Sequence, residues 1–120
     1  MILVDTSIWI TYLRSGDTRL QNLLINGEVA CHPFIIGELA CGNLQNRQAF
    51  LSLLQDLPQT NTVDQQEILY FIEIHQLMGL GIGFIDIHLL ASAKLSRMPL
   101  WTSDRRLKAA AQNLSVAFSN

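Results

Sequence analysis

Short, mostly apolar segments alternate along this chain with longer stretches of helical periodicity, and this alternation limits the possible folds more than any other feature. Short apolar segments are typical of buried strands, and strands that alternate with helices usually pair in parallel. Because parallel crossovers are right-handed, helices should cover both faces of the sheet. The pattern predicts a three-layer α/β/α domain with a mainly parallel sheet of about five strands, over residues 1–4, 29–31, 61–63, 99–102 and 116–118.

Capping residues mark the ends of several expected helices. Asp17 is suited to the N-cap of a helix that stops at Gly27, and Pro33 fits the first turn of the next helix. Asp64 followed by Glu67 resembles a capping box. The remaining helices are expected over about 6–14, 45–57 and 85–96, and after Asp104.

The composition fits one globular domain over residues 1–120, because 49% of the residues are apolar and no linker or repeat is visible. No apolar run approaches the ~20 residues that span a bilayer. No signal peptide is visible at the start of the sequence. We therefore expect a cytoplasmic protein with no membrane association.

Cys31 and Cys41 match no metal-ligand spacing with the histidines and are interpreted as core thiols.

Four acidic residues occupy positions where solvated acids are not expected. Asp5 and Asp104 each follow a predicted strand, and the carboxyl ends of parallel strands share one edge of a sheet. Glu38 shares a helix face with apolar neighbours, where a carboxylate without a partner is unfavourable. Asp86 begins another helix. Each acid also has a simpler interpretation as a helix cap, a dipole charge or an edge residue, but a shared site explains all four together.

A group of carboxylates suits a hard cation such as Mg²⁺, which prefers oxygen ligands. Such a cation can generate a nucleophile from water and neutralise charge on a phosphodiester. The histidines fit no zinc spacing, and His88, two residues from Asp86, is interpreted as structural. The glycine run at 79–83 follows a helix rather than a strand and lacks the full nucleotide-binding spacing.

The net charge of −2 does not by itself favour a nucleic-acid partner. Five of the eight basic residues nevertheless lie in one stretch beside two of the proposed acids: Lys94, Arg97, Arg105, Arg106 and Lys108. This stretch is either a solvated helix face or a weak binding patch for a phosphate backbone.

Four motifs, in this order and spacing, resemble those of PIN-domain ribonucleases, specifically the VapC-like toxins of type II toxin–antitoxin systems. They are Val4–Trp9, His32–Gly42, Gly83–Ala93 and Trp101–Arg105, and together they extend over nearly the whole chain. The resemblance implies a Mg²⁺-dependent endoribonuclease, with Mn²⁺ able to substitute, that leaves a 5′-phosphate and a 3′-hydroxyl. It also implies an RNA substrate, a cognate antitoxin protein and a homodimer.

The resemblance places the catalytic and metal-binding acids at Asp5, Glu38, Asp86 and Asp104. The first and third would be direct metal ligands, and the other two would hold and orient water. Ser7 and Thr102 match hydroxyl positions that support the pocket.

An acidic pocket also invites an arginine from the antitoxin, because arginine pairs with carboxylates through two hydrogen bonds. Trp9 and Phe34 are candidates for apolar contacts with an amphipathic helix of that partner.

Other classes share part of this pattern. A receiver-like phosphoacceptor domain has a similar length and binds Mg²⁺, but it needs an acidic pair after the first strand, where Thr6 and Ser7 follow Asp5. It also needs an Asp at the end of the third strand and a Lys at the end of the fifth. A haloacid-dehalogenase-like phosphatase needs an Asp at the position of Ser7. A non-catalytic RNA-binding module with the PIN fold stays open.

Overall fold

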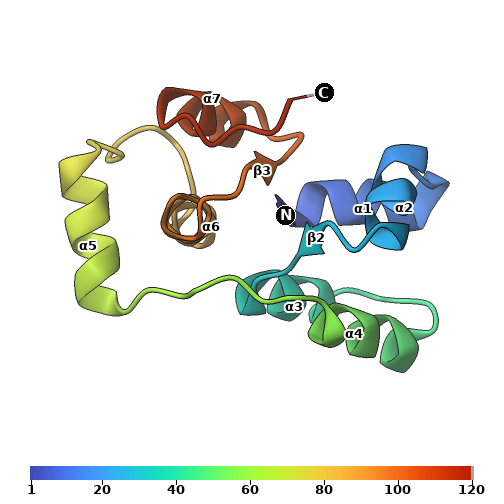
Figure 1. The fold of residues 1–120 in the computed structure, drawn as a ribbon. Coiled ribbons are helices and arrows are strands. Elements are labelled where there is room, and N and C mark those ends of the chain that lie inside the picture. Colours follow the sequence, from blue (N-terminus) through green and yellow to red (C-terminus); the bar gives the residue numbers. More distant parts are fainter. Residues whose placement is uncertain (120) are drawn as a thin grey trace.

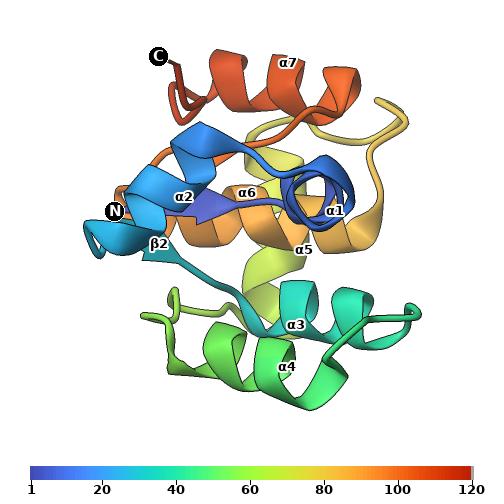
Figure 2. The same ribbon diagram turned by 90° about the vertical axis from the view of Figure 1, so that its right-hand side faces the viewer.

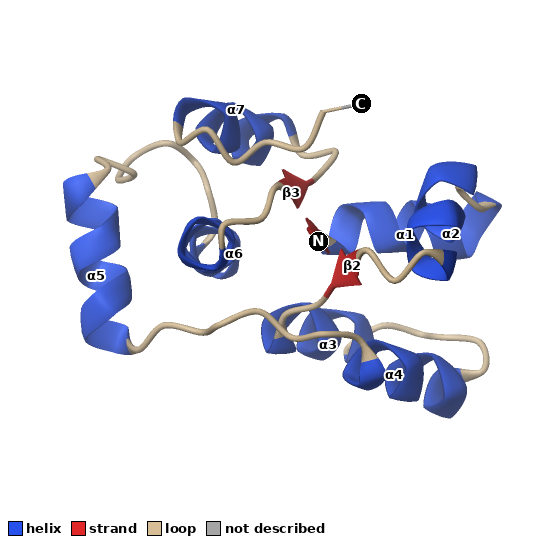
Figure 3. Cartoon of the chain, in the orientation of Figure 1, coloured by secondary structure: helices blue, strands red, loops and turns tan. Residues whose placement is uncertain are grey.

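A short parallel sheet lies at the centre of the computed structural model, which describes residues 1–119 (Figures 1 and 3). Its strands run in the order β2-β1-β3. In the register, Leu3 lies opposite Ala30 on one side and opposite Leu100 on the other. The strands are β1 (Ile2–Val4), β2 (Val29–Ala30) and β3 (Leu100–Trp101). The predicted parallel sheet is confirmed, with the buried apolar segment β1 in the middle.

Single parallel bridges extend the sheet at both edges, so that five segments of residues 1–119 take part, three of them as strands. Leu100 pairs with Ala117, within the segment predicted as the fifth strand. Cys31 pairs with Gln59 rather than with residues 61–63. The Cys31 backbone bonds the carbonyl of Pro58 and the amide of Thr60, at 2.8 and 2.9 Å. The predicted third strand was therefore placed too late, because pairing ends before residues 61–63 lead into the next helix.

Helices cover both faces of the sheet, as the alternation predicted. Figure 1 shows α6 against one face and α1 and α2 against the other, and Figure 2 shows the same layers after a 90° turn. The helices α3 and α4 lie beyond β2, α7 lies beyond β3, and α5 lies outside α6. Residues 1–119 form α1 (Thr6–Ser15), α2 (Thr18–Ile25), α3 (Pro33–Ala40), α4 (Arg47–Asp56), α5 (Gln65–Ile74), α6 (Phe84–Ser96) and α7 (Arg105–Asn113).

The expected caps hold the helix ends in place. The Asp17 side chain accepts hydrogen bonds from two amides at the start of α2. Asp64 and Glu67 form the predicted capping box of α5. At α3, Pro33 stands in the first turn, and the N-cap residue His32 accepts a hydrogen bond from the amide of Phe34 through Nδ1. These caps fix where each helix begins and therefore where its first side chains point.

The core is continuous through the sheet and α6. All residues of α6 from Ile87 to Ala93 are buried, because this helix lies between the sheet and α5. Cys31 is buried as expected, but Cys41 is exposed, so its interpretation as a core thiol was wrong. Cys41 is the C-cap of α3, where the helix leaves the core. Within residues 1–119, no helix has the length and apolar character needed to cross a membrane.

Candidate active site

The four predicted acids come from four separate elements and meet at the carboxyl edge of the sheet. Asp5 follows β1 and is the N-cap of α1, and Asp104 follows β3 and is the N-cap of α7. Asp86 lies in the first turn of α6, and Glu38 lies within α3. The carboxylates of Asp5, Glu38 and Asp104 all act electrostatically on Asp86. The fold therefore brings together residues that are up to 99 positions apart in the sequence.

Asp5 is held by a hydroxyl network. Its side chain is buried, with 4% of its surface exposed. Oδ2 accepts hydrogen bonds from Ser7 Oγ and Thr102 Oγ1, both at 2.7 Å, and a longer one of 3.4 Å from the Ser7 amide. All three bonds end on Oδ2, so they orient the carboxylate without using Oδ1.

The same two hydroxyls connect the end of β1 to the loop after β3. Ser7 Oγ accepts a hydrogen bond of 3.1 Å from the Ser103 amide, and Thr102 Oγ1 accepts one of 3.0 Å from the Asp104 amide. A hydroxyl that accepts from an amide has its proton available for a carboxylate. The supporting positions predicted for Ser7 and Thr102 are thus occupied by groups that fix Asp5.

Glu38 has a hydroxyl partner that sequence reasoning missed. Thr6 Oγ1 donates a hydrogen bond of 2.7 Å to Glu38 Oε1, and the Glu38 side chain is half-buried. Thr6 stands directly after Asp5, so the first turn of α1 contributes hydroxyls to two of the four acids. The only sequence feature that marks Thr6 is its place at the start of a helix, and threonine is common at that place.

The clustering of the acids changes the pKa of Asp86. Burial raises the pKa of Asp86 from its ordinary 3.8 to about 6, and the carboxylates of Asp5, Glu38 and Asp104 push it in the same direction. The cluster therefore concentrates negative charge in a partly desolvated place, which is unfavourable unless a cation neutralises it.

The donor set fits a hard cation, although the side chains do not yet form a closed binding site. Within residues 1–119, no three His, Cys, Asp or Glu side chains are arranged to hold a metal ion. Asp86 is half-buried and Asp104 is exposed, so both have room to rotate toward a shared point. All four side chains offer carboxylate oxygens, and Asp5 already presents Oδ1 in a fixed orientation. This chemistry suits Mg²⁺ or Mn²⁺ and not a soft metal.

Trp9 and Phe34, the two apolar residues expected to contact a partner, differ in their exposure to solvent. Trp9 is fully buried and packs against Tyr12 and Phe50, with ring centroids 6.0 and 5.8 Å apart, so it cannot contact a partner. Its indole is drawn into the core because α1 packs that face inward. Phe34 is 39% exposed, and with Phe84 it lines an apolar hollow beside Glu38.

The basic stretch is divided between two places. Lys94 and Arg97 lie in the last turn of α6 and at its C-cap, at the opposite end from Asp86. Lys94 donates to the carbonyl of Leu114 at 3.0 Å. The other three residues belong to α7, where the guanidinium of Arg106 lies over Gly81. Only the α7 residues are therefore close to a candidate acid, Asp104.

His88 does not join the acids. It is buried, and its ring packs against Phe34 and Phe84 at centroid distances of 4.9 and 4.7 Å. Burial lowers the pKa of His88, so it is neutral at pH 7. These contacts agree with the structural role that its position predicted.

Comparisons with known proteins agree on one family. The model of the PIN domain matches residues 2–113. Ribonuclease VapC32 of Mycobacterium tuberculosis, in strains CDC 1551 / Oshkosh and ATCC 25618 / H37Rv, is 45% identical over 120 residues, which is 99% of this chain and 97% of the relative. The crystal structure of PAE2754 from Pyrobaculum aerophilum superposes with a TM-score of 0.61 at 18% identity. That match covers 95% of this chain and 88% of the other, and it supports the fold alone.

Proposed function

This chain belongs to the PIN-domain family, and within that family we propose that it is a Mg²⁺-dependent endoribonuclease and the toxin of a toxin–antitoxin pair. The observation that carries this proposal is the meeting of Asp5, Glu38, Asp86 and Asp104 at one edge of the sheet, where their charges interact. The 45% identity to a protein named Ribonuclease VapC32 supports RNA as the substrate class and the toxin role.

In this proposal the residues divide the work. Asp5 and Asp86 would hold the cation, with Mn²⁺ able to replace Mg²⁺. When bound, the cation would supply a nucleophile from water and neutralise charge on the phosphodiester. Glu38 and Asp104 would orient the attacking water by accepting its protons. Ser7 and Thr102 would keep Oδ2 of Asp5 occupied, so that Oδ1 stays directed at the reacting centre.

The products would be a 5′-phosphate and a 3′-hydroxyl. In the cluster, burial and the neighbouring carboxylates raise the pKa of Asp86 to about 6. Protons therefore compete with the cation for this side chain on the acidic side of neutrality, and cleavage should decline as the pH falls through this value.

An RNA cleavage assay tests the proposal. Purified protein is incubated with single-stranded and hairpin RNAs in EDTA, Mg²⁺, Mn²⁺ or Ca²⁺, and with the variant Asp86→Asn. Cleavage should require Mg²⁺ or Mn²⁺ and should be lost in Asp86→Asn. Cleavage that persists in excess EDTA would refute the metal mechanism. RNA binding without cleavage under every condition would support the non-catalytic RNA-binding module. The receiver-like alternative has no support, because the family match extends over residues 2–113.

The proposed partners are an antitoxin protein and a second copy of this chain, in the cytoplasm. The apolar hollow lined by Phe34 and Phe84, beside Glu38, is suited to an amphipathic helix whose arginine pairs with the acids. Co-expression with an antitoxin encoded beside this chain should yield a complex that has lost RNase activity. Phe34→Ser should weaken that complex, and an unchanged complex would remove Phe34 from the interface.

A further inference from the structure

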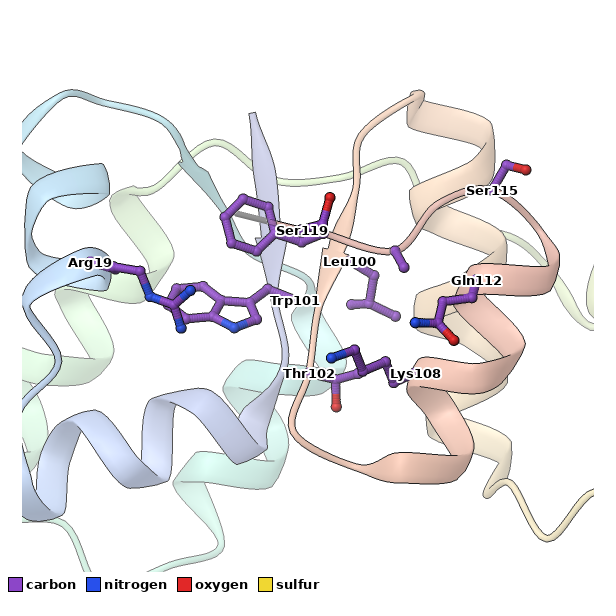
Figure 4. Close-up of a pocket in the computed structure, with 10 residues that line it drawn as sticks. Arg19, Leu100, Trp101, Thr102, Lys108, Gln112, Ser115 and Ser119 are labelled. Carbon is purple, nitrogen blue, oxygen red and sulfur yellow. The ribbon is translucent and has the colours of Figure 1, made fainter.

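A second cavity adjoins the acid cluster on the side of β3. It has a volume of about 590 Å³ and lies between α2 and α7, with β3 forming its floor (Figure 4). Its lining includes Arg19, Trp101, Thr102, Lys108 and Gln112. We call this space the cationic cavity, because two of the side chains that line it are basic and, within residues 1–119, none is acidic. Its size is within the range of cavities that bind small organic molecules.

The two basic groups converge from opposite walls. Arg19, on α2, places its guanidinium carbon 4.7 Å from the ring centroid of Trp101. Stacking on the indole fixes the plane of the guanidinium while its N–H groups stay available at the edge. Lys108, on α7, lines the same cavity and is exposed (Figure 4). The cavity thus presents one fixed and one flexible cation, a combination suited to a phosphate group.

The cationic cavity and the acid cluster share a residue. Thr102 lines the cavity, and its hydroxyl donates to Asp5 Oδ2 at 2.7 Å. A ligand that fills the cavity therefore lies one side chain away from the proposed catalytic carboxylate. Because RNA is a polyanion, a chain with one phosphate at the acid cluster needs basic groups for the phosphates on either side.

We propose that the cationic cavity binds the nucleotide of the RNA next to the scissile phosphate, an inference that rests on the proposed ribonuclease function. Arg19 and Lys108 hold the backbone phosphate of that nucleotide. Gln112 offers both a donor and an acceptor to its sugar. Trp101 is only 7% exposed and its face is covered by Arg19, so it offers no surface for base stacking. The cavity therefore recognises the RNA backbone and imposes little sequence preference at this nucleotide.

Binding measurements with charge-removing variants test this proposal. Fluorescence anisotropy is recorded for a labelled RNA in EDTA, with gels to show that the RNA stays intact, for wild type, Arg19→Gln, Lys108→Gln and the double variant. The matched control is Arg97→Gln, an exposed cation eleven positions beyond Asp86, which is about 16 Å along the helix. Thermal melts verify that each variant is folded, and Lys108→Gln alone suffices if Arg19→Gln destabilises the protein.

Each cavity variant should weaken RNA binding about fivefold and reduce the slope of log affinity against log salt by about 0.7, the value for one lost phosphate contact on a single strand. The double variant should lose about 20-fold, and Arg97→Gln less than twofold. In Mg²⁺, the cavity variants should raise KM for RNA more than they lower kcat.

The outcomes separate this proposal from the function on which it rests. Cavity variants that behave like Arg97→Gln, in a protein that binds and cleaves RNA, would overturn the subsite and leave the ribonuclease standing. A wild-type protein that neither binds nor cleaves RNA would overturn both. If 5′-AMP binds through Lys108 while RNA affinity is unchanged in Lys108→Gln, the cavity is a site for free nucleotides and the RNA subsite is wrong.

Discussion

The two sides of the acid cluster differ in what acts on their carboxylates. On the β1 side, Asp5 is buried and three hydrogen bonds end on its Oδ2. On the α6 side, burial and three neighbouring carboxylates raise the pKa of Asp86 to about 6. The hydrogen bonds fix the orientation of the Asp5 carboxylate, whereas burial and like charge favour the protonated form of Asp86. The Asp5 side is thus held in place by hydrogen bonds before a cation binds. On the Asp86 side, a bound cation would offset the repulsion between carboxylates.

This difference implies that substitutions at Asp5 and at Asp86 will lower activity alike but change the stability of the folded protein in opposite directions. Removing charge at Asp5 weakens hydrogen bonds that hold the end of β1 to the loop after β3. Removing charge at Asp86 removes repulsion. Substitutions on the two sides can therefore be used to test whether the contrast is real.

The largest expected effect is on catalysis. Asp5→Asn and Asp86→Asn should each reduce RNA cleavage at least ~100-fold in Mg²⁺, by analogy with the loss of a group that stabilises charge in the transition state. Asp17→Asn is the matched control, because Asp17 caps α2 and asparagine caps a helix about as well as aspartate. Initial rates on a labelled RNA measure the effect. Near-normal activity in either variant would remove that residue from the site.

A smaller effect on both activity and stability is expected at the hydroxyl network. Thr102→Val leaves Asp5 Oδ2 without one donor and the Asp104 amide without its acceptor. It should lower activity about 10-fold and stability by about 1–2 kcal/mol.

Thr60→Val is the control for this substitution. Thr60 is also buried, but its Oγ1 has no hydrogen-bond partner within residues 1–119, so its loss should be neutral or stabilising. The comparison uses urea melts and cleavage rates of both variants. If the two substitutions have equal effects, the network does not position Asp5.

The smallest effect is the stability change at Asp86, and it depends on pH. The folded-state pKa of about 6 lies above the unfolded value of ~3.9, so the folded protein binds this proton more tightly. The resulting stabilisation is complete below pH ~3.9 and is lost as the pH rises through 6. In EDTA at pH 7, Asp86→Asn should therefore raise stability, by about 1–2 kcal/mol after allowance for solvent screening, or about 4–8 °C in Tm.

Thermal melts of wild type and Asp86→Asn in EDTA at pH 4.5 and pH 7 measure this change. The gain should be larger at pH 7 and should shrink in excess Mg²⁺, which stabilises wild type by binding the folded state. Asp5→Asn should show the opposite sign at pH 7. A gain of equal size at both pH values would contradict the assignment of the effect to the ionised Asp86.

The sequence predicted the acid cluster because three of its four acids have a local reason to be noticed, and the family motif supplied the fourth, Asp86. Asp5 and Asp104 follow apolar strands, and Glu38 stands among apolar residues, so each position is unusual without knowledge of its neighbours. The parallel topology then determines that the ends of β1 and β3 lie at one edge of the sheet. Periodicity and capping thus predicted the layers, the helix starts and the edge at which the acids meet.

Features that depend on packing between distant segments could not be predicted. Arg19 and Lys108 lie 89 positions apart and share no motif, so nothing in the sequence pairs them. Trp9 resembles an exposed binding residue until the packing of α1 shows that its indole is inside. The edge pairing at Gln59 depends on which backbone groups reach Cys31, and a mixed polar segment does not reveal this.

The central claim is that these four carboxylates hold a divalent cation, and direct titration tests it without reliance on RNA. Mn²⁺ is titrated by calorimetry into EDTA-treated and desalted protein at pH 7, using wild type, Asp5→Asn, Asp86→Asn and Asp17→Asn. Wild type and Asp17→Asn should bind Mn²⁺ with the same affinity, while Asp5→Asn and Asp86→Asn should lose most or all of it. Equal Mn²⁺ binding in all four proteins, or none in wild type, would contradict the account.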